Sequence, residues 1–171
     1  INYASVGAGS PNHLGVEMLK FMTGIDMVHI PYKGTAPAVT DLIAGQVSLM
    51  FNSMPSVLPQ VQAGRLKGIA VGSAKRSPAA PDVPTVAESG VPGFEYVTWY
   101  GLFAPANTPK DIIAKFNTEV VRILQDKEIA QRFAREGAEP APGTPEQLAK
   151  FMRAEHEQWK KTIAAAKMKL E

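Results

Sequence analysis

The sequence predicts an α/β fold with a mainly parallel sheet, followed by a helical region. Over residues 1–100, short apolar runs alternate with segments whose apolar residues recur at helical spacing. Such alternation is typical of right-handed crossover units, which place successive strands parallel in one sheet. The chain has 171 residues, of which 45% are hydrophobic and 20% charged, so it is long enough to bury one good core.

Five short runs are predicted as strands, because each is apolar or aromatic and most are bounded by Gly or Pro. They cover residues 1–6, 26–30, 47–51, 66–71 and 96–104. The four prolines and two glycines of 73–93 predict a long surface connection before the last of these runs. The chain opens at Ile1 inside the first run without a start methionine, so we expect it to be part of a longer protein. Removal of a few leading residues is the alternative.

Capping residues mark the expected helices. Ser10 is predicted to cap a helix that begins at Pro11 and ends at Gly24, because a serine hydroxyl accepts a hydrogen bond from a first-turn amide. Capping-box patterns at Thr108 and Thr144 predict two more helix starts. Further helices are expected between 34 and 45, around 57–63 and from 126 to 137.

Composition and motif content exclude several functions. The net charge of +2 comes from 18 basic and 16 acidic residues spread along the chain. They form no cluster of basic residues of the kind that binds nucleic acid. The absence of cysteine rules out disulfides and thiol catalysis. His13, His29 and His156 lack metal-ligand spacing, and we expect His29 to be packed in its strand and His156 to be solvated. No nucleophile–base pair or paired carboxylates can be assembled from the loops, so we expect neither catalysis nor a cofactor.

Two glycine turns are the strongest candidates for a binding site. Each places backbone amides at a helix N-terminus, one over 9–12 and the other over 34–36, and such ends attract carboxylates. At the same edge of a parallel sheet the two would line one crevice. A pocket that contains Ser10, Thr35 and Asn52 but few ionisable groups suits binding more than catalysis. The alternative is that the glycines only make tight turns.

A nucleotide-dependent enzyme is a further alternative. Gly7 and Gly9 lie between a strand and a helix, as in a dinucleotide fingerprint. However, Asn12 stands where the third glycine of the fingerprint belongs. The fingerprint also needs an acidic residue about 20 positions further on, at the end of the second strand. The candidate, Asp26, begins that strand instead.

Taken together, these segments resemble a known family over essentially the whole chain. The matching stretches are YASVGAGS at 3–10 with HL at 13–14, HIPYKG at 29–34, DLIAGQV at 41–47, AGRLK at 63–67, PDVPTVAE at 81–88, WYGLFAP at 99–105 and TP at 108–109. They are similar to the Bug-type solute-binding proteins, the TctC-like extracytoplasmic receptors of tripartite tricarboxylate transporters.

The resemblance implies a periplasmic-binding-protein-like (type II) fold, in which two α/β domains flank a cleft. Residues 1–100 would form most of ligand-binding domain two. Residues 101–171 would supply the crossover strand and closing helices of domain one, whose remainder is absent. It also implies a periplasmic location, a small carboxylate ligand of the tricarboxylate, dicarboxylate, aromatic or amino acid type, and membrane permease subunits as partners. A ligand-sensing module for a signalling partner is the alternative role.

The resemblance also implies which residues bind the ligand. Asn52 stands where many relatives have Asp, so we expect a weaker preference for amino-bearing ligands. Without the rest of domain one, the apolar stripes of 108–163 would be exposed and favour self-association. The implied ligand-binding residues are Gly9, Ser10, Pro11 and His13 in the first loop, Tyr32, Gly34 and Thr35 in the second, and Asn52.

Overall fold

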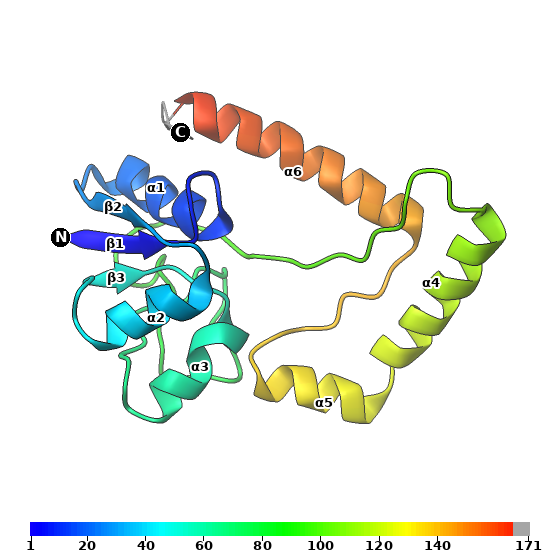
Figure 1. Cartoon of the computed structure of the whole chain (residues 1–171), viewed down its shortest axis with the longest axis horizontal. Helices are drawn as coiled ribbons and strands as arrows, with labels where there is room; N and C mark the ends of the chain where they lie inside the picture. Colours follow the sequence, from blue (N-terminus) through cyan, green and yellow to red (C-terminus); the bar gives the residue numbers. More distant parts are fainter. Residues whose placement is uncertain (166–171) are drawn as a thin grey trace.

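A computed structural model describes residues 1–165 and has three parallel strands at the centre of an α/β unit (Figure 1). The strands are β1 (Asn2–Ser5), β2 (Val28–Pro31) and β3 (Leu49–Met50). Their order is β2-β1-β3, with β1 in the middle and parallel to both neighbours. Tyr3 lies opposite His29 on one side and Leu49 on the other. The predicted parallel sheet and its first three strands are therefore confirmed, although each strand is shorter than expected.

Six helices accompany the sheet in the described part of the chain. Ser10 caps α1 as predicted, since its side chain accepts from the His13 amide, and Gly24 ends the helix in the left-handed region at φ 71°. The predicted box at Thr144 also forms, because the Thr144 amide donates to Gln147 Oε1 at 2.8 Å and the Gln147 amide donates to Thr144 Oγ1 at 3.2 Å. The helices are α1 (Pro11–Thr23), α2 (Thr35–Ile43), α3 (Met54–Gln62), α4 (Lys110–Leu124), α5 (Lys127–Arg135) and α6 (Pro145–Ala165).

The two faces of the sheet are covered by different helices. Tyr3 points to the α1 side, where it packs in one buried cluster with Val16. Its neighbour Ala4 points to the opposite side and packs in a second cluster with Ala38 of α2. Successive strand residues face opposite sides, so this alternation produces three layers with β1 buried between α1 and α2 (Figure 1).

Two predicted strands are wrong. Of residues 66–71, Val71 alone forms a bridge, to Thr85, and 96–104 is irregular. An apolar run becomes a strand only when its backbone groups pair with a neighbour over several residues. Here the pairing is limited to a few bonds, among them the one from the Tyr96 amide to the Gly72 carbonyl at 2.8 Å.

The predicted surface connection over 73–93 is also partly wrong. Thr85 is 1% exposed and Val86 is buried, and Val86 joins Phe94 and Tyr96 in a third core cluster on the α1 side. Prolines shape this segment into turns, but its apolar residues still fill the space beside α1. The connection is therefore part of the core.

The C-terminal helices lie largely outside this core. The predicted box at Thr108 does not form, since α4 begins after Pro109 with no side-chain cap. No residue of α4 or α5 is buried. Helix α6 runs back over the α1 side of the sheet (Figure 1), where Trp159 meets the Tyr96 ring edge-on at 5.5 Å. The predicted closing region, 101–171, extends beyond the described residues.

Candidate functional site

A cavity of about 210 Å³ lies at the carboxyl ends of β1 and β3. In parallel α/β sheets this edge is the usual place for a ligand. Hydroxyl, amide, aromatic and small apolar side chains line the cavity, and none of the lining side chains is charged. The lining residues are Val6, Pro11, Asn12, Thr35, Asn52, Ser53, Ser56, Thr98, Trp99 and Tyr100.

Three helix N-termini meet at this cavity. Pro11 and Thr35 are the first residues of α1 and α2, and Ser53 is the N-cap of α3. The first amides of a helix have no acceptor within the helix, and the helix dipole makes this end positive. The caps of α2 and α3 make no side-chain hydrogen bond to these amides. The site therefore offers neutral donors and partial positive charge, which suits a carboxylate.

The third helix end was missed by the sequence analysis, which expected a helix only around 57–63. The helix begins at Met54, so Ser53 and Ser56 reach the cavity. The signal was present in the sequence, because Ser53 is followed by Pro55 in the first turn. That pairing is typical of a helix start.

The first predicted loop is largely satisfied by its own hydrogen bonds. The Gly9 amide donates to His13 Nδ1 at 3.0 Å. The Ser10 hydroxyl donates to the Gly7 carbonyl at 2.6 Å and accepts from the His13 amide at 3.4 Å. Of the four residues implied for this loop, Pro11 lines the cavity. Gly9, Ser10 and His13 do not line it and instead make hydrogen bonds within the loop.

In the second predicted loop, one residue of three reaches the cavity. Thr35 lines it, while Gly34 is the N-cap of α2 with φ 136°, a conformation that glycine adopts readily. The Tyr32 hydroxyl donates to Asp41 Oδ2 at 2.8 Å, which ties this side chain to α2. Tyr32 and Gly34 therefore shape the loop, and Thr35 faces the space that a ligand would occupy.

Asn52 lines the cavity and is held by a neighbour that was not predicted. Asn12 Nδ2 donates to Asn52 Oδ1 at 3.2 Å and to the Phe51 carbonyl. The Ser53 amide also donates to Asn52 Oδ1, at 2.9 Å. Within residues 1–165, Asn52 Nδ2 donates one hydrogen bond, to the Met50 sulfur at 3.6 Å, which is a weak acceptor. Asn12, which breaks the dinucleotide fingerprint, thus fixes Asn52 with its amino group available.

A stacked pair of histidines supports the first loop. The rings of His13 and His29 lie 4.3 Å apart at 20°, and His29 Nε2 contacts the Ser5 hydroxyl. His29 is thus packed and hydrogen-bonded, as predicted. Burial is the main cause that lowers the pKa of both histidines from 6.5. In residues 1–165, no three His, Asp or Glu side chains are grouped closely enough to hold a metal.

Glu17 lies beside this pair, on α1. Its Oε1 accepts from the Tyr3 hydroxyl at 2.8 Å and from Lys20 Nζ at 2.7 Å. Burial alone would raise the pKa of Glu17, but the hydrogen bonds from Lys20 and Tyr3 keep that pKa below its ordinary value. Glu17 is therefore charged at neutral pH.

The segment 98–100 forms a wall of the cavity and contacts α6. Trp99 meets Phe151 edge-on at 5.3 Å. Two residues before this segment, the Tyr96 hydroxyl donates to the Pro11 carbonyl at 2.8 Å. The aromatic pattern of these residues predicted a strand and not a part of the site. Only their contacts in the folded chain reveal that role.

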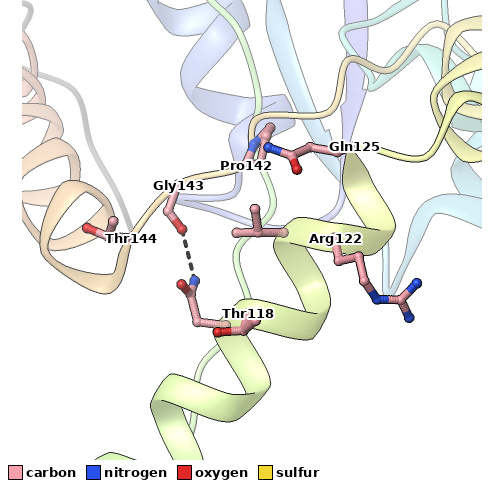
Figure 2. Close-up of a pocket in the computed structure, with 8 residues that line it drawn as sticks. Thr118, Arg122, Gln125, Pro142, Gly143 and Thr144 are labelled. Carbon is pink, nitrogen blue, oxygen red and sulfur yellow. Dashed lines mark hydrogen bonds between the residues drawn. The ribbon is translucent and has the colours of Figure 1, made fainter.

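A second hollow, of about 520 Å³, lies between α4 and the segment before α6 (Figure 2). Asn117 Nδ2 donates to the Gly143 carbonyl at 2.9 Å, and Arg122 pairs with Glu119 at 3.0 Å. The bond from Asn117 attaches the segment to α4, whereas the Arg122–Glu119 pair lies within the helix. No predicted site residue lies here. We therefore take the cavity at the sheet edge as the candidate site.

No helix in residues 1–165 has the length and apolar character to cross a bilayer.

Known proteins are similar to this chain in both fold and sequence. The family described as "Tripartite tricarboxylate transporter family receptor" matches residues 1–168. Protein BugT of Bordetella pertussis is 36% identical over 170 residues, which cover 99% of this chain and 52% of BugT. R. palustris Rpa4515 with adipate superposes with a TM-score of 0.94 at 37% identity, over 97% of this chain and 56% of that one. MatC from Rhodopseudomonas palustris with bound malate has a TM-score of 0.86 at 34% identity, over 95% and 56%.

These findings define the class and the family. The fold is that of the periplasmic binding proteins, as predicted. The chain belongs to the tripartite tricarboxylate transporter receptor family, whose members are solute-binding receptors. It spans about half the length of most of the curated relatives it matches, and 94% of one of them.

Proposed function

We propose that this chain forms the ligand-binding part of a receptor that captures a small carboxylate for a tripartite transporter. The convergence of three helix N-termini on one uncharged cavity carries this proposal. A carboxylate accepts hydrogen bonds from such amides and is stabilised by the helix dipoles without a cationic side chain. Related proteins hold adipate and malate, which are dicarboxylates.

Pro11, Thr35 and Asn52 are the proposed ligand contacts among the predicted residues, since they line the cavity. The other five proposed site residues act by shaping the two loops. Asn52 offers an amide in place of a carboxylate, so an ammonium group would find no negative partner. The proposed ligand is therefore a carboxylate without an amino group.

The proposed arrangement has two domains. Residues 1–100 would form most of the ligand-binding domain, and 101–171 would belong with a partner domain. The exposed side chains of Tyr100, Leu102 and Phe103 support this division, because an apolar run of this kind is ordinarily covered. Closure about the segment 96–104 would then bury the ligand.

We also propose a periplasmic location, membrane permease subunits as partners and no catalytic role. The family and the periplasmic binding protein BugD, which is 38% identical, support this assignment. A sensing role would use the same site. A nucleotide-binding role is disfavoured, because the Gly9 amide is bonded to His13 and the Asn12 side chain occupies the third-glycine position.

Calorimetric titration of the full-length protein with malate, adipate, glutamate and NAD tests the proposal. We expect saturable binding of a dicarboxylate and no binding of NAD. Thr35→Val should weaken that binding about tenfold, the loss of one hydrogen bond. Thr40→Val is the matched control, since Thr40 lies exposed on the same helix and its hydroxyl donates to the Ala36 carbonyl. If none of the carboxylates binds, the proposal is wrong.

The 171-residue chain on its own is proposed to self-associate. Ile112 and Phe116 on α4 are 53% and 60% exposed, and Phe133 on α5 is also exposed. Light scattering should show a dimer or a larger assembly, and Phe116→Glu should shift it toward the monomer. A stable monomer of the unmodified chain would contradict this.

A further inference from the structure

We propose that His13 is a positioning residue that holds the turn 7–10 in its binding shape, and that protonation of His13 releases this turn. The consequence for ligand affinity rests on the proposed function. The effect on the turn itself follows from the geometry of His13, Gly9 and their neighbours.

The contact between His13 and Gly9 fixes the protonation state of the ring. The Gly9 amide donates to His13 Nδ1 at 3.0 Å, so Nδ1 must be unprotonated. The neutral ring therefore carries its proton on Nε2, which faces Glu17 Oε1 at 4.0 Å. The side chain is only 4% exposed, so water is a poor substitute for this hydrogen bond.

The other end of the turn is held through His29. The Ser5 hydroxyl donates to the Gly7 carbonyl at 3.1 Å and accepts from the Gly7 amide at 3.0 Å. The same Ser5 hydroxyl is hydrogen-bonded to His29 Nε2. The stacked histidines thus hold the turn at both Gly7 and Gly9.

This turn connects two residues of the cavity wall. Val6 precedes it and Pro11 follows it, and both line the cavity. Gly7 and Gly9 have φ of 121° and 73°, a region where glycine exchanges conformations without steric cost. Without the bond to His13, the Gly9 amide would lose its acceptor, while the Ser10 amide and hydroxyl would still donate to the Gly7 carbonyl.

Protonation would replace this bond with a repulsion. A proton on Nδ1 would face the Gly9 N–H, so two donors would meet in a buried place. The charged groups near His13 act in opposite directions, since Glu17 favours the charged ring while Lys20 and a charged His29 oppose it. Burial is the largest influence and lowers the pKa of His13 below 6.5. The Gly9 end of the turn is therefore held at neutral pH and is released only at a pH below 6.5.

Nitrogen-15 NMR of the unliganded protein tests this directly. Long-range spectra should show a bare Nδ1 on His13 at pH 7.5, and the Gly9 amide shift should follow the titration of His13. In His13→Asn the side-chain oxygen replaces Nδ1 as acceptor but does not titrate, so the pH-dependent shift of Gly9 should disappear. His156→Asn is the matched control, because His156 is exposed on α6 and should leave the shift unchanged. A protonated Nδ1 at pH 7.5, or a Gly9 shift independent of His13, would overturn the proposal.

A second measurement compares malate affinity at pH 7.5 and 5.5. The wild type should lose more affinity than His13→Asn, by less than about tenfold because the pKa of His13 lies below 6.5. Both proteins meet the same protonation states of malate. Equal losses would overturn the role of His13 while leaving the receptor assignment intact. If neither protein binds malate, adipate or another carboxylate, the proposed function fails, and the NMR titration still decides the role of His13.

Discussion

Asn12 and Asn52 join two elements of the candidate site through their side-chain amides. Asn12 Nδ2 donates to Asn52 Oδ1 at 3.2 Å and also to the Phe51 carbonyl, so the first turn of α1 is attached to the loop after β3. Asn12 is 8% exposed, which makes its amide a buried structural link. The residue therefore explains both the absence of a dinucleotide fingerprint and the orientation of Asn52.

Asn12→Ala should destabilise the fold and weaken ligand binding. The substitution leaves the Phe51 carbonyl without this donor, which costs about 1–3 kcal/mol when the group stays buried. Urea denaturation measures the change in the free energy of unfolding. Asn107→Ala, in an exposed turn before α4, is the matched control and should change it by less than about 0.5 kcal/mol. An equal effect of both substitutions would contradict the role of Asn12.

Asn52→Asp should change the ligand preference. A carboxylate at this position repels a dicarboxylate ligand and attracts an ammonium group. We expect affinity for malate to fall at least tenfold and affinity for aspartate or glutamate to rise, as measured by calorimetry. Asn107→Asp adds the same charge far along the chain and should leave both affinities unchanged. If Asn52→Asp left the order of ligands unaltered, Asn52 would not be a ligand contact.

Gly15→Ala should be destabilising, contrary to the intrinsic preference of a helix for alanine. A Cβ at Gly15 would lie 2.9 Å from Tyr96 Cε1 and 3.1 Å from Phe51 Cδ1. Overpacking of this kind costs about 1–3 kcal/mol, whereas alanine in a free helix gains about 1 kcal/mol over glycine. In a Tyr96→Leu background the cost should shrink, which a double-mutant cycle measures. A stabilising Gly15→Ala in the wild type would contradict the packing described.

The free energy of unfolding should fall in mild acid. The pKa values of His13 and His29 are lowered in the folded protein, chiefly by burial, so the unfolded chain binds more protons as pH drops below 6.5. Their contribution is present above pH 6.5 and is lost as pH falls toward the folded values. The lowered pKa of Glu17 acts in the same direction, from about pH 4.5 downward.

Urea titrations between pH 5 and 8 measure this dependence. His13→Asn should reduce the slope between pH 6.5 and 5, and the exposed His156→Asn should not. Stability that rose as pH fell through this range would show that the folded state charges its histidines more easily than the unfolded chain.

Features set by local residues were predictable from the sequence. Ser10, Gly24 and Thr144 mark helix ends through contacts within one or two turns, and all three act as expected. The strands at 66–71 and 96–104 were not predictable in this way, because an apolar run needs a paired neighbour that is set by the tertiary fold. The same limit applies to the capping pattern at Thr108, where the helix starts two residues later.

The candidate site, like the fold, was predictable only where local sequence determines the position of a residue. Pro11, Thr35 and Asn52 lie on the segments that follow the three strands, so their place at one edge of the sheet could be deduced. Trp99 and Tyr100 reach the cavity because the preceding Tyr96 packs against Phe51 and bonds the Pro11 carbonyl. These long-range contacts leave no local pattern in the sequence. The bond from Gly9 to His13 was also hidden, since the pattern predicted a free amide at that position.

Amide chemical-shift mapping of the full-length protein with malate and adipate tests the central claim most directly. We expect saturable shifts at the first-turn amides of α1, α2 and α3, including Asn12 and Thr35, with no change around Asn117 and Gly143. Saturable shifts confined to the hollow beside α4, or no shifts with either dicarboxylate, would contradict the claim that these helix ends form the carboxylate site.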